Sequence, residues 1–196
     1  MTRRKRIAEP VGTDQRSPLS DKARGSGRPF SPETAWAVLF MASGADPAWL
    51  GANVGRSLRR RLKRQSGSSL LEQLPRLSRR GSVRYFLGSV AAQAEIREHP
   101  AFVASGVSGA DHYGANVIAP GVLEGYLPAN EIERLAHLFA LREVEELRAN
   151  LILRAPAIWP FVSEGVAPRA VVAVDLLESA SQRTKDAGRD LLRAGT

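Results

Sequence analysis

The chain has 196 residues, which is enough for one large domain or two small ones. Hydrophobic residues make up 43% of it and charged residues 24%, so a buried core is expected and wholesale disorder is not. The absence of cysteine excludes disulfides, thiolate metal ligands and a cysteine nucleophile. No apolar run approaches the roughly 20 residues that span a bilayer, and the basic N-terminus lacks the apolar core of a signal peptide. We therefore expect a cytoplasmic protein with no membrane partner.

The charge of the chain is unevenly distributed. Residues 1–84 contain 18 Lys and Arg against 6 Asp and Glu, a net charge of +12. Residues 85–196 contain 10 against 14, a net charge of −4. Such asymmetry predicts that the first part binds a polyanion, and nucleic acid is the natural candidate because neutralised phosphates release condensed counterions. A DNA-binding protein associated with the nucleoid is the resulting expectation.

The composition predicts three parts. Residues 1–29 are rich in Pro, Gly, Ser and charge and are expected to form a disordered basic tail. Residues 30–88 have the order of a winged helix-turn-helix, and residues 89–196 are expected to form a small C-terminal α/β domain for regulation, dimerisation or opposition to a toxin. The fold class expected for the whole chain is mainly α with short β segments (α+β). Within the tail, Gly27-Arg28-Pro29 resembles the centre of an AT-hook that enters the minor groove, with a solvated basic linker as the alternative.

The first helix signals begin at Ser31, an N-cap residue followed by Pro32 at the first helical position. Trp36, Leu39 and Phe40 then recur at helical spacing and are expected to be buried, and Gly44 is expected to end the helix. Asp46-Pro47 starts a second helix in the same way.

The stretch Arg56–Arg64 predicts a basic helix. Leu58 and Leu62 share one face, and the opposite face is cationic. No acidic residue occurs between Asp46 and Glu72, so the charge repulsion is uncompensated unless an anion binds. A merely solvated helix face is the alternative. The cations of this helix that we expect to contact DNA are Arg56, Arg59, Arg60, Lys63 and Arg64.

A leucine stripe within Ser69–Leu77 predicts a further helix that is most simply part of a core. Gln73 and Arg76 would be its exposed positions if this helix, and not the preceding one, enters the major groove; the sequence leaves that choice open. Arg79, Arg80 and Arg84 surround Gly81 in a tight turn that leads into a strand, the position of a wing that contacts the phosphate backbone or the minor groove.

Shorter elements are expected in the second half. Helices are predicted from Ala91 to Glu98, from an Asn130 cap with Ile132, Leu135, Leu138 and Phe139 facing inward, from Pro168 to about Leu177, and from Arg183 to Arg193. Strands are predicted at Ala115–Ala119 and Leu151–Leu153, and a loop at Val103–Gly109. Arg142–Arg148 is ambiguous. Asp175 stands out inside the apolar RAVVAVDLLES helix, either as a paired core carboxylate or as a contact to a partner.

Motifs for catalysis are missing. The chain has no phosphate-binding loop, no dinucleotide fingerprint and no HExxH. Ser108, Asp111 and His112 are close in sequence, but adjacent residues of a Gly-rich loop rarely converge on one reacting atom. His99, His112 and His137 lack ligand spacing. We therefore expect no enzymatic activity, no metal and no cofactor.

The segments SGVSGAD, ANVIAPGVLEGYLPANEIERLAHLFAL, ANLILR, WPF and APRAVVAVDLLES, together with the basic head, resemble AbiEi-type antitoxins. These belong to bacterial type IV toxin–antitoxin pairs and are related to transcriptional regulators encoded beside nucleotidyltransferase-like genes. The similarity covers most of residues 30–194. Asp175 and Leu176 match a terminal Asp-Leu pattern, whereas the long basic tail and the long stretch between the first helix and the wing depart from the family.

The resemblance implies a transcriptional repressor that binds inverted repeats of double-stranded DNA in its own promoter, as a homodimer or as two protomers. It also implies that the second domain opposes a nucleotidyltransferase-like toxin. A solitary transcription factor or a nucleoid-associated protein is the alternative. The further residues expected to contact DNA are Arg28, Gln73, Arg76, Arg79, Arg80 and Arg84.

Overall fold

The structure is a computed structural model that describes residues 28–47, 49–50, 55–60, 70–162 and 165–194. The expected basic tail up to residue 27, and Leu62, Lys63 and Arg64 of the expected basic helix, lie outside the described residues.

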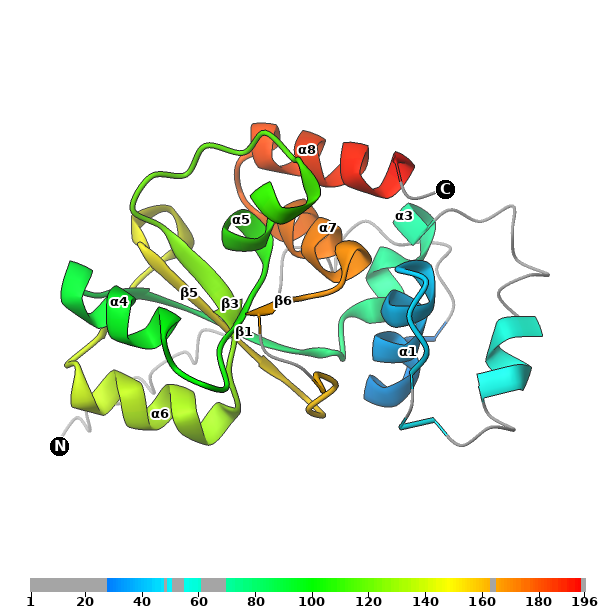
Figure 1. Ribbon diagram of the computed structural model, residues 1–196, viewed down its shortest axis with the longest axis horizontal. Helices are drawn as coiled ribbons and strands as arrows, with labels where there is room; N and C mark the ends of the chain where they lie inside the picture. Colours follow the sequence, from blue (N-terminus) through cyan, green and yellow to red (C-terminus); the bar gives the residue numbers. More distant parts are fainter. Residues whose placement is uncertain (1–27, 48, 51–54, 61–69, 163–164, 195–196) are drawn as a thin grey trace, which may run out of the picture.

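A six-stranded mixed sheet forms the centre of the molecule (Figure 1). Its strand order is β4-β1-β5-β3-β2-β6. β1 is antiparallel to β4 and β5, β3 runs parallel to β5 and antiparallel to β2, and β6 runs parallel to β2. The strands are β1 (Gly81–Leu87), β2 (Val103–Ala104), β3 (Leu123–Tyr126), β4 (Arg142–Glu143), β5 (Leu151–Pro156) and β6 (Gly165–Val166).

Helices surround this sheet, so the fold is α+β. The α-helices are α1 (Pro32–Ala42), a segment at 55–60, α3 (Leu70–Gln73), α4 (Val90–Arg97), α5 (Gly106–Gly109), α6 (Ala129–Leu138), α7 (Arg169–Glu178) and α8 (Gln182–Arg193). Three 3-10 turns are η2 (Leu74–Leu77), η3 (Asp111–Tyr113) and η4 (Glu146–Arg148).

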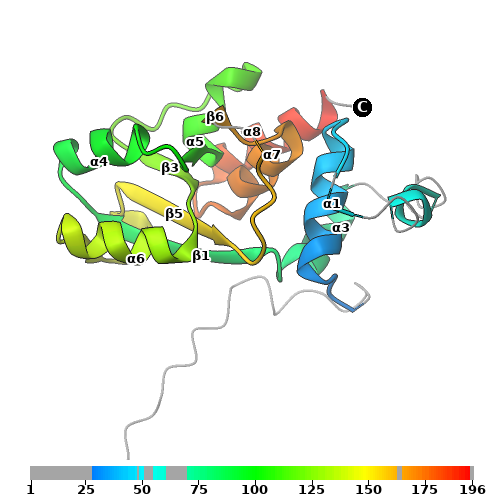
Figure 2. The same ribbon diagram turned by 60° about the horizontal axis from the view of Figure 1, so that its bottom comes forward.

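Alternation along the strands divides the core between the two faces of the sheet. In β3, Leu123 packs in a cluster with Ile132 of α6 and Ile96 of α4. Tyr126, three residues further along β3, belongs to a second cluster that contains residues of α1 and α7. Figures 1 and 2 show α4 and α6 together at the end of the molecule opposite α1, while α7 and α8 lie side by side. The side chains of the α7 face are the ones that form the buried network described below.

Helix α1 begins and ends as the sequence predicts. The Ser31 hydroxyl accepts a hydrogen bond from the Thr34 amide, and Pro32 is the first helical residue. Gly44 follows the helix with φ of +76°, the left-handed conformation that glycine adopts without strain. Trp36, Leu39 and Phe40 are buried, as expected, and the Trp36 indole donates to the Arg80 carbonyl at 2.8 Å. This bond attaches α1 to the start of β1.

The strand expected to complete a winged head belongs to the central sheet. β1 pairs with β5 in a register that runs from Gly81 opposite Pro156 to Phe86 opposite Leu151. The described residues show no separate winged helix-turn-helix domain. The reason is long-range: β1 finds its pairing partner some 70 residues further along the chain, in a segment that local patterns assign to another unit.

Two segments of the second half differ from expectation. Val103–Gly109, predicted as a loop, contains β2 and α5. Ala115–Ala119, predicted as a strand, has no regular structure, and the strand instead lies at Leu123–Tyr126. The sequence did not predict this strand because it contains Glu124 and Gly125, and both a charged residue and a glycine are unusual inside a strand.

Most of the remaining elements agree with the patterns, but the helix expected to start at Asp46-Pro47 does not: 45–47 have no regular structure, and Trp49 and Leu50 lie in a turn. α4, β5, α7 and α8 lie within a few residues of the predicted ranges. The cap of α6 is Pro128, and Asn130 lies in its first turn. Ile132 and Leu135 are buried as expected, whereas Leu138, at the last helical position, is 60% exposed.

Candidate nucleic-acid interface and a buried ionic network

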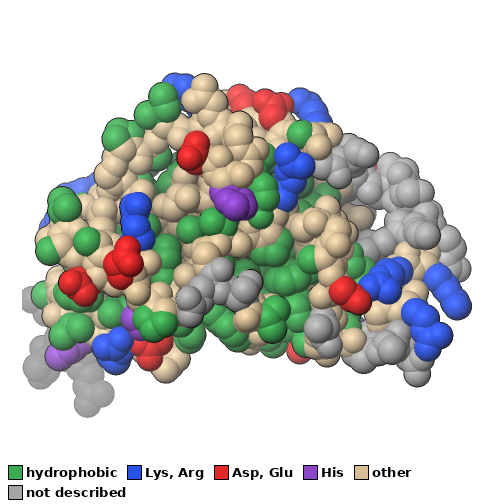
Figure 3. Space-filling view, in the orientation of Figure 1, with side chains coloured by type: hydrophobic (Ala, Val, Ile, Leu, Met, Phe, Trp, Pro, Cys, Tyr) green, Lys and Arg blue, Asp and Glu red, His purple; other side chains and the backbone are tan. Residues whose placement is uncertain are grey.

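The helix at 55–60 carries the exposed cations that the sequence predicts. Leu58 is buried, whereas Arg56, Arg59 and Arg60 are exposed. Both ribbon views place this helix at one end of the molecule, beyond α1 (Figures 1 and 2). Lys and Arg side chains gather over the same end in Figure 3, and we call Arg56, Arg59 and Arg60 the arginine surface.

An acidic side chain, Asp46, is paired with this surface. Asp46 accepts a hydrogen bond from Arg59 Nη2 at 2.5 Å, and both side chains are largely solvent-exposed. Exposed ion pairs contribute little to stability, because water and salt screen them and two long side chains must be ordered. Exchange of the Asp46 carboxylate for a phosphate would therefore cost little.

Gln73 of α3 is buried, and Arg76 of η2 contacts other residues of the protein. Gln73, expected at an exposed reading position, is only 7% exposed. The Arg76 guanidinium lies 3.8 Å from the centre of the Phe30 ring, and its Nε donates to the Arg28 carbonyl at 3.4 Å. Arg28 itself is exposed. The structure therefore places Arg28 and Arg76 close together, and Gln73 beneath the surface.

The three arginines of the expected wing have different environments. Arg79 is exposed in the turn before β1. Arg84 forms ion pairs with Glu133 of α6, at 2.5 Å, and with Glu143 of β4, at 3.0 Å. The side chain of Arg80 is only 7% exposed and its donors bind carboxylates, so it cannot reach a phosphate in this conformation. A local pattern of arginines around a glycine does not reveal this difference.

Arg80 is part of a buried ionic network on the α7 face of the sheet. Asp175 Oδ1 accepts from Arg80 Nη2 and from the Tyr126 hydroxyl, each at 2.9 Å. Asp175 Oδ2 accepts from the Ser105 hydroxyl at 2.5 Å. Both oxygens of this carboxylate thus accept hydrogen bonds from protein donors, as burial of such a group requires. The sequence identified Asp175 as unusual; its pairing in the core is the simpler of the two explanations considered there.

Arg154 of β5 joins two further carboxylates to the network. Its Nη2 lies 2.8 Å from Glu124 of β3, and its Nη1 lies 2.8 Å from Glu178 of α7. Glu178 also accepts two hydrogen bonds from Arg80, at 2.7 and 2.6 Å. The other Glu124 oxygen accepts from the Val107 amide at 2.9 Å. The network therefore connects β1, β3, β5, α5 and α7.

Burial and charge act in opposite directions on these groups. Burial raises the pKa of Glu124 to about 7, although Arg154 acts to lower it. Burial also acts to raise the pKa of Glu178, but Arg80 and Arg154 outweigh it and lower that pKa to about 2. The carboxylates in turn raise the pKa of Arg80 and of Arg154, in spite of the desolvation that acts against them.

The network links α7 to the strands of the sheet by buried ion pairs. Its three carboxyl groups share two guanidinium groups, and Arg80, Arg154, Asp175 and Glu124 have almost no contact with solvent. The part of the chain that the structure describes holds no cluster of His, Asp and Glu suited to a metal ion. Sequence reasoning missed Glu124, Arg154 and Glu178 because each is unremarkable in its own segment.

The histidines and the Ser108 segment form no common site. His99 lies 3.2 Å from Glu131, and the ring of His112 packs edge-on against Tyr113. Ser108 accepts a hydrogen bond from the Glu124 amide at 2.9 Å, while Asp111 and His112 are exposed. This hydrogen bond links Ser108 of α5 to β3.

Comparison with protein-family models, curated proteins and solved structures found no match to this chain. Among the helices of the described ranges, none is long and apolar enough to cross a membrane. Any functional conclusion therefore rests on the residues themselves.

Proposed function

We propose that the protein binds double-stranded DNA through the arginine surface and acts as a transcriptional repressor. The observation that carries this proposal is the position of Arg56, Arg59 and Arg60. They are exposed on a helix at one end of the molecule, and Leu58 of the same helix is buried. A helix presented at one end of a molecule can enter a major groove without a clash from the body.

The charge distribution supports the same proposal. The 25 residues between Asp46 and Glu72 contain six Lys and Arg and no acid, so the arginine surface lies within a segment of one charge sign. Phosphate binding would relieve the repulsion and release counterions. Most contacts of this kind fix affinity and orientation, and only a few side chains would read base edges.

The other arginines divide into two groups under this proposal. Arg79 and Arg28 are exposed and are proposed as additional phosphate contacts. Arg80 is buried, and Arg84 is partly buried between Glu133 and Glu143, so we leave them out of the interface. The proposal needs no separate winged domain, since the helix at 55–60 would be the contacting element.

The resemblance to AbiEi-type antitoxins extends the proposal to autoregulation. In that case the protein binds inverted repeats in its own promoter as a homodimer or as two protomers, and the sheet-containing part opposes a nucleotidyltransferase-like toxin. A solitary transcription factor or a nucleoid-associated protein is the second candidate, and the exposed arginines favour it equally. DNA sequence preference separates a repressor from a nucleoid-associated protein, and a neighbouring nucleotidyltransferase gene separates an antitoxin from a solitary transcription factor.

The experiment is a gel-shift titration of the full chain against the DNA upstream of its own gene, with scrambled DNA of equal length and composition as the control. Each titration is made at a low and a high salt concentration. Preference for the upstream fragment that persists at high salt supports an autoregulatory repressor. Equal, salt-sensitive binding to both fragments supports a nucleoid-associated protein, and absence of binding to either rejects the proposal.

A further inference from the structure

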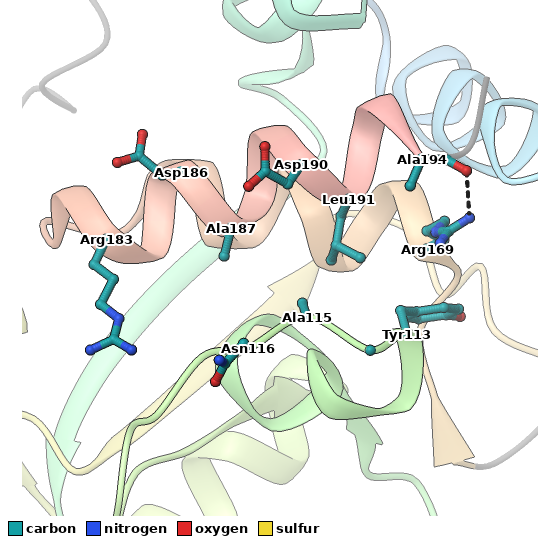
Figure 4. A pocket seen from close by; sticks show the side chains of 11 residues that line it. Tyr113, Ala115, Asn116, Arg169, Arg183, Asp186, Ala187, Asp190, Leu191 and Ala194 are labelled. Atoms are coloured by element: carbon teal, nitrogen blue, oxygen red, sulfur yellow. Dashed lines mark hydrogen bonds between the residues drawn. The ribbon is translucent and has the colours of Figure 1, made fainter.

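A groove lies between α8 and the loop that follows η3 (Figure 4). Its volume is about 410 Å³, within the range of cavities that hold small organic molecules. Its apolar wall is formed by Ala115 of the loop and by Ala187 and Leu191 of α8. The charged residues of its lining are Arg169, Arg183, Asp186 and Asp190, and Tyr113 lies beside Arg169.

The groove is lined by charges of both signs, Arg169 and Arg183 against Asp186 and Asp190. Figure 4 shows Arg183 and Arg169 at its two ends, and the Asp186 carboxylate on the side of α8 away from Arg183. Each aspartate is also paired along its own helix. Asp186 accepts from Arg189 and from Gln182, and Asp190 lies 3.1 Å from Arg193. The charge of each aspartate is therefore offset by an arginine of its own helix, and Arg169 and Arg183 are the cations that an acidic ligand would meet.

Arg169 has unused binding capacity at this site. Its Nε is buried and has no hydrogen-bond partner within the described part of the chain. Its Nη1 makes one long hydrogen bond, 3.3 Å, to the Ala194 carbonyl, and its guanidinium lies 5.9 Å from the centre of the Tyr113 ring. A guanidinium whose end makes only one long bond to a neutral carbonyl keeps donors for a ligand, and an acidic oxygen in the groove would accept a charge-assisted bond from them.

The backbone around Arg169 adds to this preference. Arg169 is the first residue of α7, where the helix dipole is positive and the first turn contains no acidic residue. A cation at this end of a helix is electrostatically unfavourable unless an anion lies beside it. The Ala194 carbonyl supplies only a partial negative charge.

We propose that this groove binds a small organic acid. Its carboxylate or phosphate group accepts hydrogen bonds from Arg169, and its apolar body lies against Ala115, Ala187 and Leu191. Arg183 contributes attraction from the far end without a direct bond to the acid. This site is separate from the arginine surface, and the inference does not depend on DNA binding.

The test is an NMR titration of the full chain with benzoate and with phenyl phosphate, and benzyl alcohol serves as the uncharged counterpart. Binding of at least one acid is expected, with shifts of the Ala115 and Ala187 amides, and benzyl alcohol should not bind. The stronger of the two acids identifies the acidic group. Arg169→Gln should weaken its binding by about tenfold or more, as loss of a charge-assisted hydrogen bond predicts.

Three further variants separate the groove from a general charge effect. Ala187→Leu fills the groove without changing the charge and should abolish binding. Arg183→Gln should weaken it by a smaller factor than Arg169→Gln. Arg134→Gln, on the exposed surface of α6, is the control and should leave the affinity unchanged.

The inference is overturned if neither acid binds at millimolar concentration, or if Arg134→Gln weakens binding as much as the groove variants do. Equal binding of benzyl alcohol would also reject it. Should Arg169→Gln fail to fold, Ala187→Leu and Arg183→Gln decide the question. DNA binding is measured separately, so its failure and the failure of this inference are distinguishable.

Discussion

Arg80 and Asp175 form a buried ion pair of 2.9 Å although 95 residues separate them in the sequence. Arg80 immediately precedes β1, and Asp175 lies in the middle of α7. The pair therefore links the last arginines of the basic half to the most apolar helix of the acidic half. Because this pair is buried, the positive charge of Arg80 does not mark a surface that binds DNA.

Replacement of Arg80 should destabilise the protein strongly. Arg80→Ala leaves Asp175 and Glu178 without a principal partner in a buried site, and removal of one member of a buried ion pair costs about 3–5 kcal/mol. The free energy of unfolding from urea denaturation measures this loss. Arg79→Ala is the matched control, because its exposed side chain should change that free energy by no more than about 0.5 kcal/mol. Equal effects of the two variants would contradict the assignment of Arg80 to the core.

The pKa values of two network carboxyls predict how stability depends on pH. The pKa of Glu124 is raised from 4.5 to about 7, so its contribution is fully present below pH 4.5 and is lost as the pH rises to 7. The pKa of Glu178 is lowered from 4.5 to about 2, so its contribution is present above pH 4.5 and is lost as the pH falls towards 2. Together they favour the folded state most near pH 4.5.

Urea denaturation at a series of pH values tests this dependence. In the wild type, the free energy of unfolding should fall between pH 4.5 and 7. Glu124→Gln cannot lose the proton and should remove most of that fall, while the decline below pH 4.5 persists. A Glu124→Gln variant with the wild-type pH profile would show that another group is responsible.

Gly106→Ala should disrupt the network from the side of α5. A Cβ atom at Gly106 would overlap the Glu124 carboxylate, and the residue has φ of +50°. Gly114 also has positive φ, +70°, but a Cβ there meets no atom within 4 Å, so Gly114→Ala measures the backbone strain alone. Strain of that kind costs about 1–3 kcal/mol. We expect thermal unfolding to show a clearly larger loss for Gly106→Ala, and equal losses would mean that Glu124 is not held as described.

Local signals predicted the helix boundaries better than the pairing of distant segments. Ser31, Pro32 and Gly44 define α1, and Pro168 precedes α7, because caps and proline act within one turn of the chain. The strand β3 was missed, since Glu124 is tolerated there only through Arg154, which is 30 residues away. Arg80 was assigned to a wing for the same reason: its acidic partners are on α7.

The arginine surface was predictable in part. The spacing of Leu58 against Arg56, Arg59 and Arg60 is enough to divide a helix into a buried and an exposed face, and the structure has that division. Gln73 was expected at an exposed position of the leucine-striped helix if that helix entered the groove, but it is buried, and α1 packs against η2, which directly follows it. Single-segment patterns cannot anticipate what a neighbouring element covers.

The most direct test of the proposed function is the salt dependence of DNA affinity for the wild type and for the triple variant Arg56→Gln, Arg59→Gln and Arg60→Gln. Arg97→Gln, Arg134→Gln and Arg142→Gln, three exposed positions far from the arginine surface, form a control variant of equal net charge. If the arginines bind phosphates, the slope of log K against log salt should become shallower by about 2–3 in the first variant, because each lost contact removes about 0.9. The control should keep the wild-type slope. Identical slopes for all three proteins would contradict DNA binding through this helix.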